Sequence, residues 1–211
     1  MRLIICRHCA TQFNEEHRVQ GQLTDMPLSS LGERQAGRLA EVLSRELITM
    51  VYTSPLGRAL QTASVISSQF PDLKTYADIR LQEINVGIAE SWPLDELKEK
   101  FPSFWAEWQG SSDVQWPGGE RVSDVRHRAS EFLEAMMGKH LNDTIVAVTH
   151  ATPAASLLAL GLGLPLGGYR QLWLDVGHYS ILESNGNTDG YACGVRGMVL
   201  KGHNLAPLEK N

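Results

Sequence analysis

The sequence predicts an α/β fold of three layers, with helices on both faces of a mostly parallel central sheet. Two short apolar runs, RLIICR at residues 2–7 and TIVAVT at residues 144–149, are typical of strands buried on both faces. Helical patterns separate these runs, and strands that alternate with helices favour a parallel sheet. The length of 211 residues suits one core, so we expect a single domain over residues 1–211.

The elements between the two runs are predicted from caps and apolar spacing. Ser30-Leu-Gly-Glu33 reads as a capping box, and apolar residues then recur at three- and four-residue spacing as far as Leu47, which indicates a helix. A strand is expected at 48–53. Ser54-Pro55 follows it and predicts an N-cap and a first-turn proline for a helix at 58–68.

The second half of the chain continues the alternation. The turn Pro117-Gly-Gly should begin a long helix at about 120–140, and another helix is expected at 153–162. The remaining expected elements are strands at 172–176, 180–183 and 191–200, with Asn185-Gly186 as a hairpin turn between the last two.

The segment from about 84 to 119 is predicted to be an inserted helical lid, and it carries four of the five tryptophans. Two interpretations are open. The aromatic side chains could pack into a small core of their own, or their rings could shape a substrate pocket.

Charge and hydropathy limit the classes of partner. A net charge of −5 argues against non-specific binding to nucleic acid or to an anionic membrane. The opening apolar run is too short for a signal peptide, and the most apolar stretch, residues 151–166, is shorter than the roughly 20 residues of a membrane span. We therefore expect a cytoplasmic protein without nucleic-acid or membrane partners.

The stretch Cys6-Arg7-His8-Cys9 has two possible meanings, a cysteine pair or a reactive histidine. Residues three apart in a strand are roughly 10 Å apart, too far for a disulfide, and no second cysteine pair is present for a structural zinc site. An odd total of three cysteines also fits a reducing compartment. Cys6 is expected to be a small buried core residue.

The histidine interpretation is favoured because ligands of α/β proteins bind beyond the carboxyl ends of the strands. His8 directly follows the first apolar run and His150 follows the second, while Arg58 begins the helix after another expected strand. If these strands are neighbours, Arg7 joins them at the same edge. Two guanidinium groups and two imidazoles there would suit a phosphoryl dianion.

Seven short motifs then occur in order over residues 2 to about 160. They are Arg7-His8-Cys9-Ala10-Thr11-Gln12-Phe13-Asn14, Gln20-Gly21, Asp25-Met-Pro-Leu-Ser29, Ser54-Pro-Leu-Gly-Arg58-Ala-Leu-Gln-Thr62-Ala63, Leu81-Gln-Glu83-Ile-Asn-Val-Gly87, Gly118-Gly-Glu120 and Thr149-His150. As a set they resemble the histidine phosphatase superfamily, in its branch of phosphoglycerate-mutase-like metabolite phosphatases. The resemblance implies a phosphoglycerate mutase-like fold.

The resemblance also implies a mechanism. His8 would be the nucleophile that forms a phosphohistidine, Arg7, Arg58 and His150 would hold the phosphoryl oxygens, and Glu83 would be the general acid. No metal and no cofactor are implied, because the arginines supply the positive charge. Residues expected on the substrate side are Asn14, Gln20, Gly21 and Ala151.

Several alternatives stay open. Cys9 and Ala151 stand where the family usually has glycine, so a catalytically weak relative that only binds phosphate esters is one alternative, and a Cys9 thiol of lowered pKa is another expectation. Phosphoglycerate mutase-type transfer is a further alternative, although the segment of about 35 residues between Glu83 and Gly119 favours a phosphatase.

The expected partner is a small phosphorylated metabolite, and a homodimer stays open. The substrate groups that the family suggests are those of phosphoserine, α-ribazole and broad-specificity phosphatases. Arg121, Arg126 and Arg128 are expected to form a solvated helix face.

Overall fold

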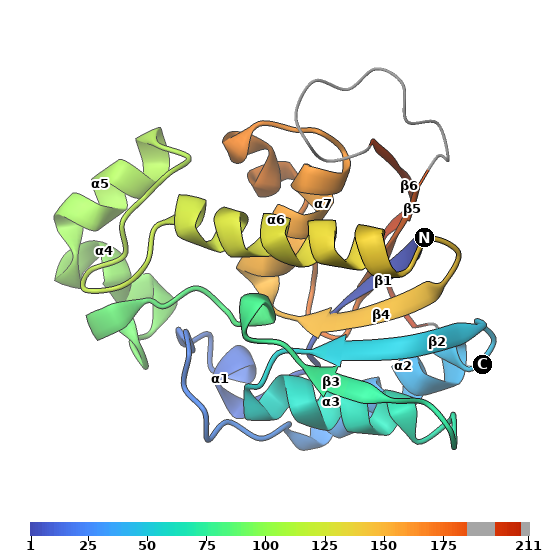
Figure 1. Ribbon diagram of the computed structural model, residues 1–211. Helices are drawn as coiled ribbons and strands as arrows, with labels where there is room; N and C mark the ends of the chain where they lie inside the picture. Colours follow the sequence, from blue (N-terminus) through green and yellow to red (C-terminus); the bar gives the residue numbers. More distant parts are fainter. Residues whose placement is uncertain (185–196, 208–211) are drawn as a thin grey trace.

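The computed structural model describes residues 1–184 and 197–207, and its centre is a six-stranded sheet (Figure 1). The strand order is β3-β2-β4-β1-β5-β6. The strands are β1 (Arg2–Arg7), β2 (Ile48–Thr53), β3 (Thr75–Ala77), β4 (Thr144–Thr149), β5 (Tyr179–Ser184) and β6 (Met198–Leu205).

The two apolar runs pair directly in the middle of this sheet. Strand β1 runs parallel to β4, with Arg7 opposite Thr149, and β4 runs parallel to β2. Only β5 and β6 are antiparallel to their neighbours within the part of the chain described. The carboxyl ends of β1, β2 and β4 therefore meet at one edge, as the sequence predicts.

Helices cover both faces of the sheet (Figure 1). The face of α2 and α3 buries one apolar cluster, and the face of α6 and α7 buries a larger one. The α-helices are α1 (Gln12–Glu15), α2 (Ser30–Leu43), α3 (Gly57–Ser67), α4 (Leu97–Lys100), α5 (Pro102–Gly110), α6 (Val122–Lys139) and α7 (Ala151–Gly161). The 3₁₀ segments are η1 (Ile79–Leu81), η2 (Gly87–Ala89), η3 (Leu94–Glu96) and η4 (Leu166–Gln171). No helix in residues 1–184 and 197–207 is long and apolar enough to cross a bilayer.

Two predicted caps are wrong in detail. Helix α2 is capped by Ser29, whose side chain accepts from the backbone N–H of Gly32, and not by Ser30. Ser54 does not cap α3, which begins after Leu56 without a side-chain cap. The Ser54 hydroxyl is instead used at the site described below.

The strand predictions after residue 165 were partly wrong. Residues 172–176 form no strand; the Leu174 carbonyl in this segment instead accepts from the side chain of Arg7 at the end of β1. The last strand, β6, begins at Met198, and residues 191–196 of the expected strand lie outside the described residues. The expected turn at Asn185-Gly186 lies outside the described residues, and β3, an exposed edge strand of three residues, was not predicted.

The aromatic rings of the insertion pack against one another and onto the main core, not into a separate core of their own. The rings of Phe104 and Trp116 have centroids 4.4 Å apart, and Trp108 lies against both of them. These rings, with those of Trp92 and Trp105, join the larger apolar cluster or pack on it. The structure thus supports the packing interpretation for the lid tryptophans, with the main core in place of a small core of their own.

Candidate active site

His8 and His150 lie side by side at the carboxyl edge of the sheet. The pairing of β1 with β4 sets this arrangement, since the His8 backbone N–H donates to the Thr149 carbonyl at 2.9 Å. The two ring centroids are 5.0 Å apart, and both side chains are buried. The histidine interpretation depended on these two strands being neighbours, and they pair directly.

The hydrogen bonds of His8 define its tautomer. Nδ1 lies 2.8 Å from the Cys9 carbonyl oxygen, which can only accept, so the ring proton belongs on Nδ1. Nε2 accepts from Nε of Arg58 at 3.3 Å. The lone pair of Nε2 therefore points into the site.

Each nitrogen of the Arg58 guanidinium makes one hydrogen bond within the protein, and the residue is only 1% exposed; one N–H on Nη1 and one on Nη2 remain for another acceptor. Its Nη1 donates to the Leu23 carbonyl at 2.9 Å and its Nη2 to the Gly21 carbonyl at 2.8 Å. Gly21 has φ of +52°, and a Cβ there would lie 2.4 Å from Val86. The loop that holds Arg58 consequently requires glycine at this position.

Both histidines are kept neutral by their environment. Burial, and then the positive charges of Arg58 and Arg7, lower the pKa of His8 well below its usual value, while the bond to the Cys9 carbonyl opposes this. Burial also lowers the pKa of His150 well below its usual value, followed by Arg58, His8 and Arg7. A neutral imidazole is the form that can act as a nucleophile.

His150 has one ring nitrogen bound and one open. Nε2 lies 2.8 Å from the Ser54 hydroxyl oxygen, whereas Nδ1 is buried without a hydrogen-bond partner among the described residues. When the Ser54 hydroxyl donates to Nε2, the ring proton sits on Nδ1 and can be donated to an anion. Sequence reasoning missed this use of Ser54 because a serine before proline reads as a helix cap.

Arg7 is held from one side by the segment that follows η4. Its Nη1 donates to the Leu174 carbonyl at 2.8 Å, and its guanidinium carbon lies 5.1 Å from the ring centroid of Trp173. Nε has no partner among residues 1–184 and 197–207. Burial lowers the pKa of Arg7, against the charges of Glu83 and Asp175.

Glu83 lies against the first turn of α7. Its Oε2 accepts from the Ala151 N–H at 3.0 Å, and its Oε1 accepts from Thr152 at 3.2 Å and from Ile84 at 2.9 Å. The carboxylate thus binds the positive end of a helix. Its charge also acts on both Arg7 and Arg58, where it opposes the lowering of their pKa by burial.

The loop that carries Glu83 is fixed by Arg128 of α6. Arg128 donates to the carbonyls of Gln82 at 2.5 Å and of Glu83 at 3.0 Å. Its side chain is only 15% exposed, so the prediction of a solvated helix face is wrong for this residue. The helical spacing alone could not show which arginine points inward.

Of the four predicted substrate-side residues, Asn14, Gln20 and Gly21 lie in or just after α1, whereas Ala151 begins α7 and donates to Glu83. The Thr11 hydroxyl lies 3.0 Å from Oδ1 of Asn14 and 3.0 Å from Oε1 of Gln20. Both amide oxygens are therefore turned towards Thr11, which leaves the amide nitrogens as donors for another group. Gln20 is buried and is followed by Gly21 in the loop that holds Arg58.

Cys9 differs from the expectation of a reactive thiol. Burial raises the pKa of its thiol to about 12, although a bond to Thr62 opposes this. The residue is fully buried in the apolar cluster beneath α2 and α3. A lowered pKa for Cys9 is thus wrong, and Cys6 is a buried core residue as predicted.

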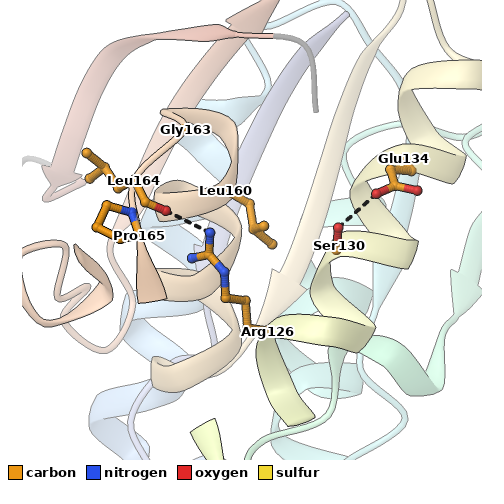
Figure 2. A pocket seen from close by; sticks show the side chains of 7 residues that line it. All are labelled: Arg126, Ser130, Glu134, Leu160, Gly163, Leu164 and Pro165. Atoms are coloured by element: carbon orange, nitrogen blue, oxygen red, sulfur yellow. Dashed lines mark hydrogen bonds between the residues drawn. The ribbon is translucent and has the colours of Figure 1, made fainter. Parts of the chain in front are cut away.

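A cavity of about 380 Å³ lies elsewhere, between α6 and the end of α7 (Figure 2). Figure 2 shows Arg126 donating to the Leu164 carbonyl and Ser130 donating to Glu134 within it. None of the predicted site residues lines this cavity. It is therefore separate from the histidine pair.

Known proteins of similar sequence match the chain over most of its length. The chain is 33% identical over 184 residues to "Phosphoserine phosphatase 1" of Hydrogenobacter thermophilus, covering 87% of this chain and 86% of that protein. It is 34% identical over 175 residues to "Probable phosphoglycerate mutase GpmB" of Cronobacter sakazakii, covering 82% and 80%.

Solved structures share the fold over nearly the whole chain. A mycobacterial glucosyl-3-phosphoglycerate phosphatase in complex with VO3 has a TM-score of 0.85 at 27% identity, covering 97% of this chain and 99% of that one. YhfR of Bacillus stearothermophilus has a TM-score of 0.84 at 29% identity, covering 99% of both chains. The family model "Histidine phosphatase superfamily (branch 1)" matches residues 3–191, and the chain belongs to that family.

Proposed function

We propose that the protein is a phosphomonoesterase that hydrolyses a small phosphorylated metabolite through a phosphohistidine on His8. The observation that carries this proposal is the fixed tautomer of His8, with Nδ1 towards the Cys9 carbonyl and Nε2 accepting from Arg58. A buried neutral imidazole whose lone pair faces the Arg58 guanidinium, with the charge of Arg7 also acting on it, is suited to attack phosphorus.

In the first step, the Nε2 lone pair of His8 forms a bond to phosphorus while the bond from phosphorus to the ester oxygen breaks. The leaving oxygen takes a proton from the carboxyl group of Glu83 and departs as an alcohol. Arg7, Arg58 and Nδ1–H of His150 surround the equatorial oxygens and offset their charge.

In the second step, a water oxygen attacks the phosphorus of the phosphohistidine and the P–N bond breaks. Glu83, now a carboxylate, takes the proton from that water, and the electron pair returns to Nε2 of His8. Inorganic phosphate is released and the starting state is restored.

The same donor set supports turnover without a metal ion. Arg7 and Arg58 supply two positive charges at the nucleophile, which is the role that Mg²⁺ plays in many phosphoryl transfers. We expect activity to survive exhaustive dialysis against EDTA. Loss of turnover in EDTA, with recovery on adding Mg²⁺ or Zn²⁺, would contradict this part of the proposal.

The experiment that tests the nucleophile compares wild type with His8→Asn. Wild type, mixed with 4-nitrophenyl phosphate and quenched in alkali within milliseconds, should carry a phosphoryl group on His8 when digested and analysed by mass spectrometry. His8→Asn should carry none and should lose turnover by about 10⁴-fold or more. Tight phosphate binding by a wild type that neither turns over nor is labelled would instead indicate a binding protein.

Phosphoglycerate mutase-type transfer is the second candidate, because relatives at 31–34% identity carry that name. A mutase must protect its phosphohistidine from water until the second substrate arrives. Incubation with 3-phosphoglycerate and a bisphosphoglycerate primer separates the two. A phosphatase releases phosphate, whereas a mutase accumulates 2-phosphoglycerate.

A further inference from the structure

The fifth tryptophan lies apart from the other four. Trp92, Trp105, Trp108 and Trp116 are buried or half-buried in the lid and against the core. Trp173 follows η4, and 52% of its surface is exposed. Its neighbours Leu172 and Leu174 are buried, so alternation along the extended segment turns the Trp173 side chain outward.

Trp173 is also the aromatic residue in contact with the phosphate-binding arginine. The guanidinium carbon of Arg7 lies 5.1 Å from the indole centroid, and the next residue accepts from Nη1 of Arg7 through its carbonyl. The remaining Arg7 donors include Nε, which has no partner among the described residues. A phosphate bound by those donors would share the guanidinium group that Trp173 contacts.

The segment that carries Trp173 is anchored at several points, so the ring has a defined position. The Asp175 backbone N–H donates to Oδ1 of Asn204 at 2.8 Å, and Nδ2 of Asn204 donates back to the Asp175 carboxylate at 2.9 Å. Gly177 donates to the His8 carbonyl at 3.0 Å. The segment is thus tied to both β6 and the nucleophile.

We propose that Trp173 is a specificity-determining residue, whose exposed ring contacts the alcohol part of the substrate and selects phosphomonoesters with a flat, apolar group. The proposal rests on the proposed function only in taking the phosphate to bind at Arg7. Aromatic rings favour flat partners through offset stacking. A small polar alcohol would leave the ring in water and gain little from it.

The competing explanation is that the ring only supports Arg7 through its cation–π contact. Two non-hydrolysable probes, benzylphosphonate and methylphosphonate, distinguish these roles because they share a phosphonate and differ in the ring. Affinities are measured by calorimetry on wild type, Trp173→Ala and Trp173→Phe. Tyr76→Ala is the matched control, because it removes another exposed aromatic ring, on β3.

Wild type should bind benzylphosphonate about five- to tenfold more tightly than methylphosphonate. Trp173→Ala should lose this preference while its methylphosphonate affinity stays within about twofold, and Trp173→Phe should keep most of the preference. Tyr76→Ala should match wild type. Because Trp173 is half exposed, its truncation opens no core cavity, and Trp173→Leu repeats the test with a non-planar apolar side chain.

Three results would overturn the proposal: no preference in wild type, a preference that survives in Trp173→Ala, or equal weakening of both probes by that change. The last would assign the ring to Arg7 alone. Failure to hydrolyse any phosphomonoester, with the benzylphosphonate preference intact, would overturn the hydrolase function and leave the role of Trp173 supported. If neither phosphonate binds, the phosphate site at Arg7 is wrong and both proposals fall.

Discussion

Glu83 illustrates how a single residue can be tested for one step of the reaction. Glu83→Gln keeps one of the two oxygens, which can still accept from Ile84 and Thr152, but it loses the oxygen that accepts from Ala151 and has no proton to give to a poor leaving group. We expect the first turnover on an alkyl phosphate to slow by about 100-fold or more. The first turnover on 4-nitrophenyl phosphate should change far less, because nitrophenolate leaves without a proton.

Rapid-quench measurement of that first turnover checks the prediction. The variant should also show a burst of nitrophenol equal to the enzyme concentration, since the second step still needs Glu83 as a base. If the first turnover slows equally on both substrates, Glu83 is not the general acid.

Arg128 provides a second prediction at the residue scale. It holds the loop that carries Glu83 and is proposed to make no contact with the phosphate itself. Arg128→Met leaves the carbonyls of Gln82 and Glu83 without their donor. We expect a loss of about 2 kcal/mol of stability and a kcat about tenfold lower. Arg121→Met, at the exposed start of the same helix, is the matched control and should behave like wild type in thermal melts and in turnover.

At the residue scale, the sequence indicates the candidate site residues but not the residues that hold them in place. Arg7, His8, Arg58 and His150 could be recognised because strand ends and motif spacing are local signals. Ser54 could not, since its hydroxyl bonds to a histidine 96 positions away. The inward turn of Arg128 likewise depends on a contact between α6 and a distant loop, which no local pattern encodes.

At the scale of elements, the two ends of the inserted segment, near residues 85 and 119, lie so close together that only glycine fits at position 119. A Cβ on Gly119 would lie 2.1 Å from the Asn85 carbonyl oxygen, and backbone cannot yield as a side chain can. Gly119→Ala should therefore lower the free energy of unfolding by about 2 kcal/mol or more. Denaturant unfolding provides the measurement.

Gly138→Ala is the control for that change. Gly138 lies in α6, and a Cβ there meets nothing within 4 Å. Because alanine is the better helix former, this variant should be more stable than wild type by about 0.5–1 kcal/mol. Equal effects of the two substitutions on the free energy of unfolding would show that the close contact with Asn85 does not require glycine at position 119.

Elements with strong periodicity were predictable, and those set by tertiary contacts were not. The long helices α2 and α6 follow their apolar spacing, and β1 and β4 follow their apolar runs. The segment 172–176 has the composition of a strand, yet its Leu174 carbonyl holds Arg7, and Gly177 just after it donates to the His8 carbonyl. The strand propensity of this segment is overridden by these tertiary contacts.

At the scale of the whole molecule, the strand order brings the site together. Residues 7, 58, 83 and 150 are far apart in the chain, and the parallel pairing of β1, β4 and β2 sets their ends side by side. The alternation of strands and helices predicts a parallel sheet. It does not predict the order β3-β2-β4-β1-β5-β6, because order depends on which distant strands pair.

Burial of two neutral histidines beside two arginines makes the stability of the whole fold sensitive to acid. The pKa of His8 and of His150 is lowered well below 6.5 in the native state, whereas in the unfolded chain each titrates near 6.5. Below that pH the unfolded state binds protons that the native state does not. The free energy of unfolding therefore has its full contribution from the two neutral histidines above about pH 6.5, and this contribution is lost as the pH falls.

Urea unfolding at several pH values between 7.5 and 5 tests this directly. His8→Asn removes one of the two groups, so its free energy of unfolding should fall less steeply with acid than that of wild type, by up to about 1.4 kcal/mol per pH unit. Other titrating groups are common to both proteins and cancel in the difference. Parallel curves for the two proteins would mean that His8 binds as many protons in the native state as in the unfolded state, so its pKa would not be lowered and the electrostatic support for a neutral nucleophile would be lost.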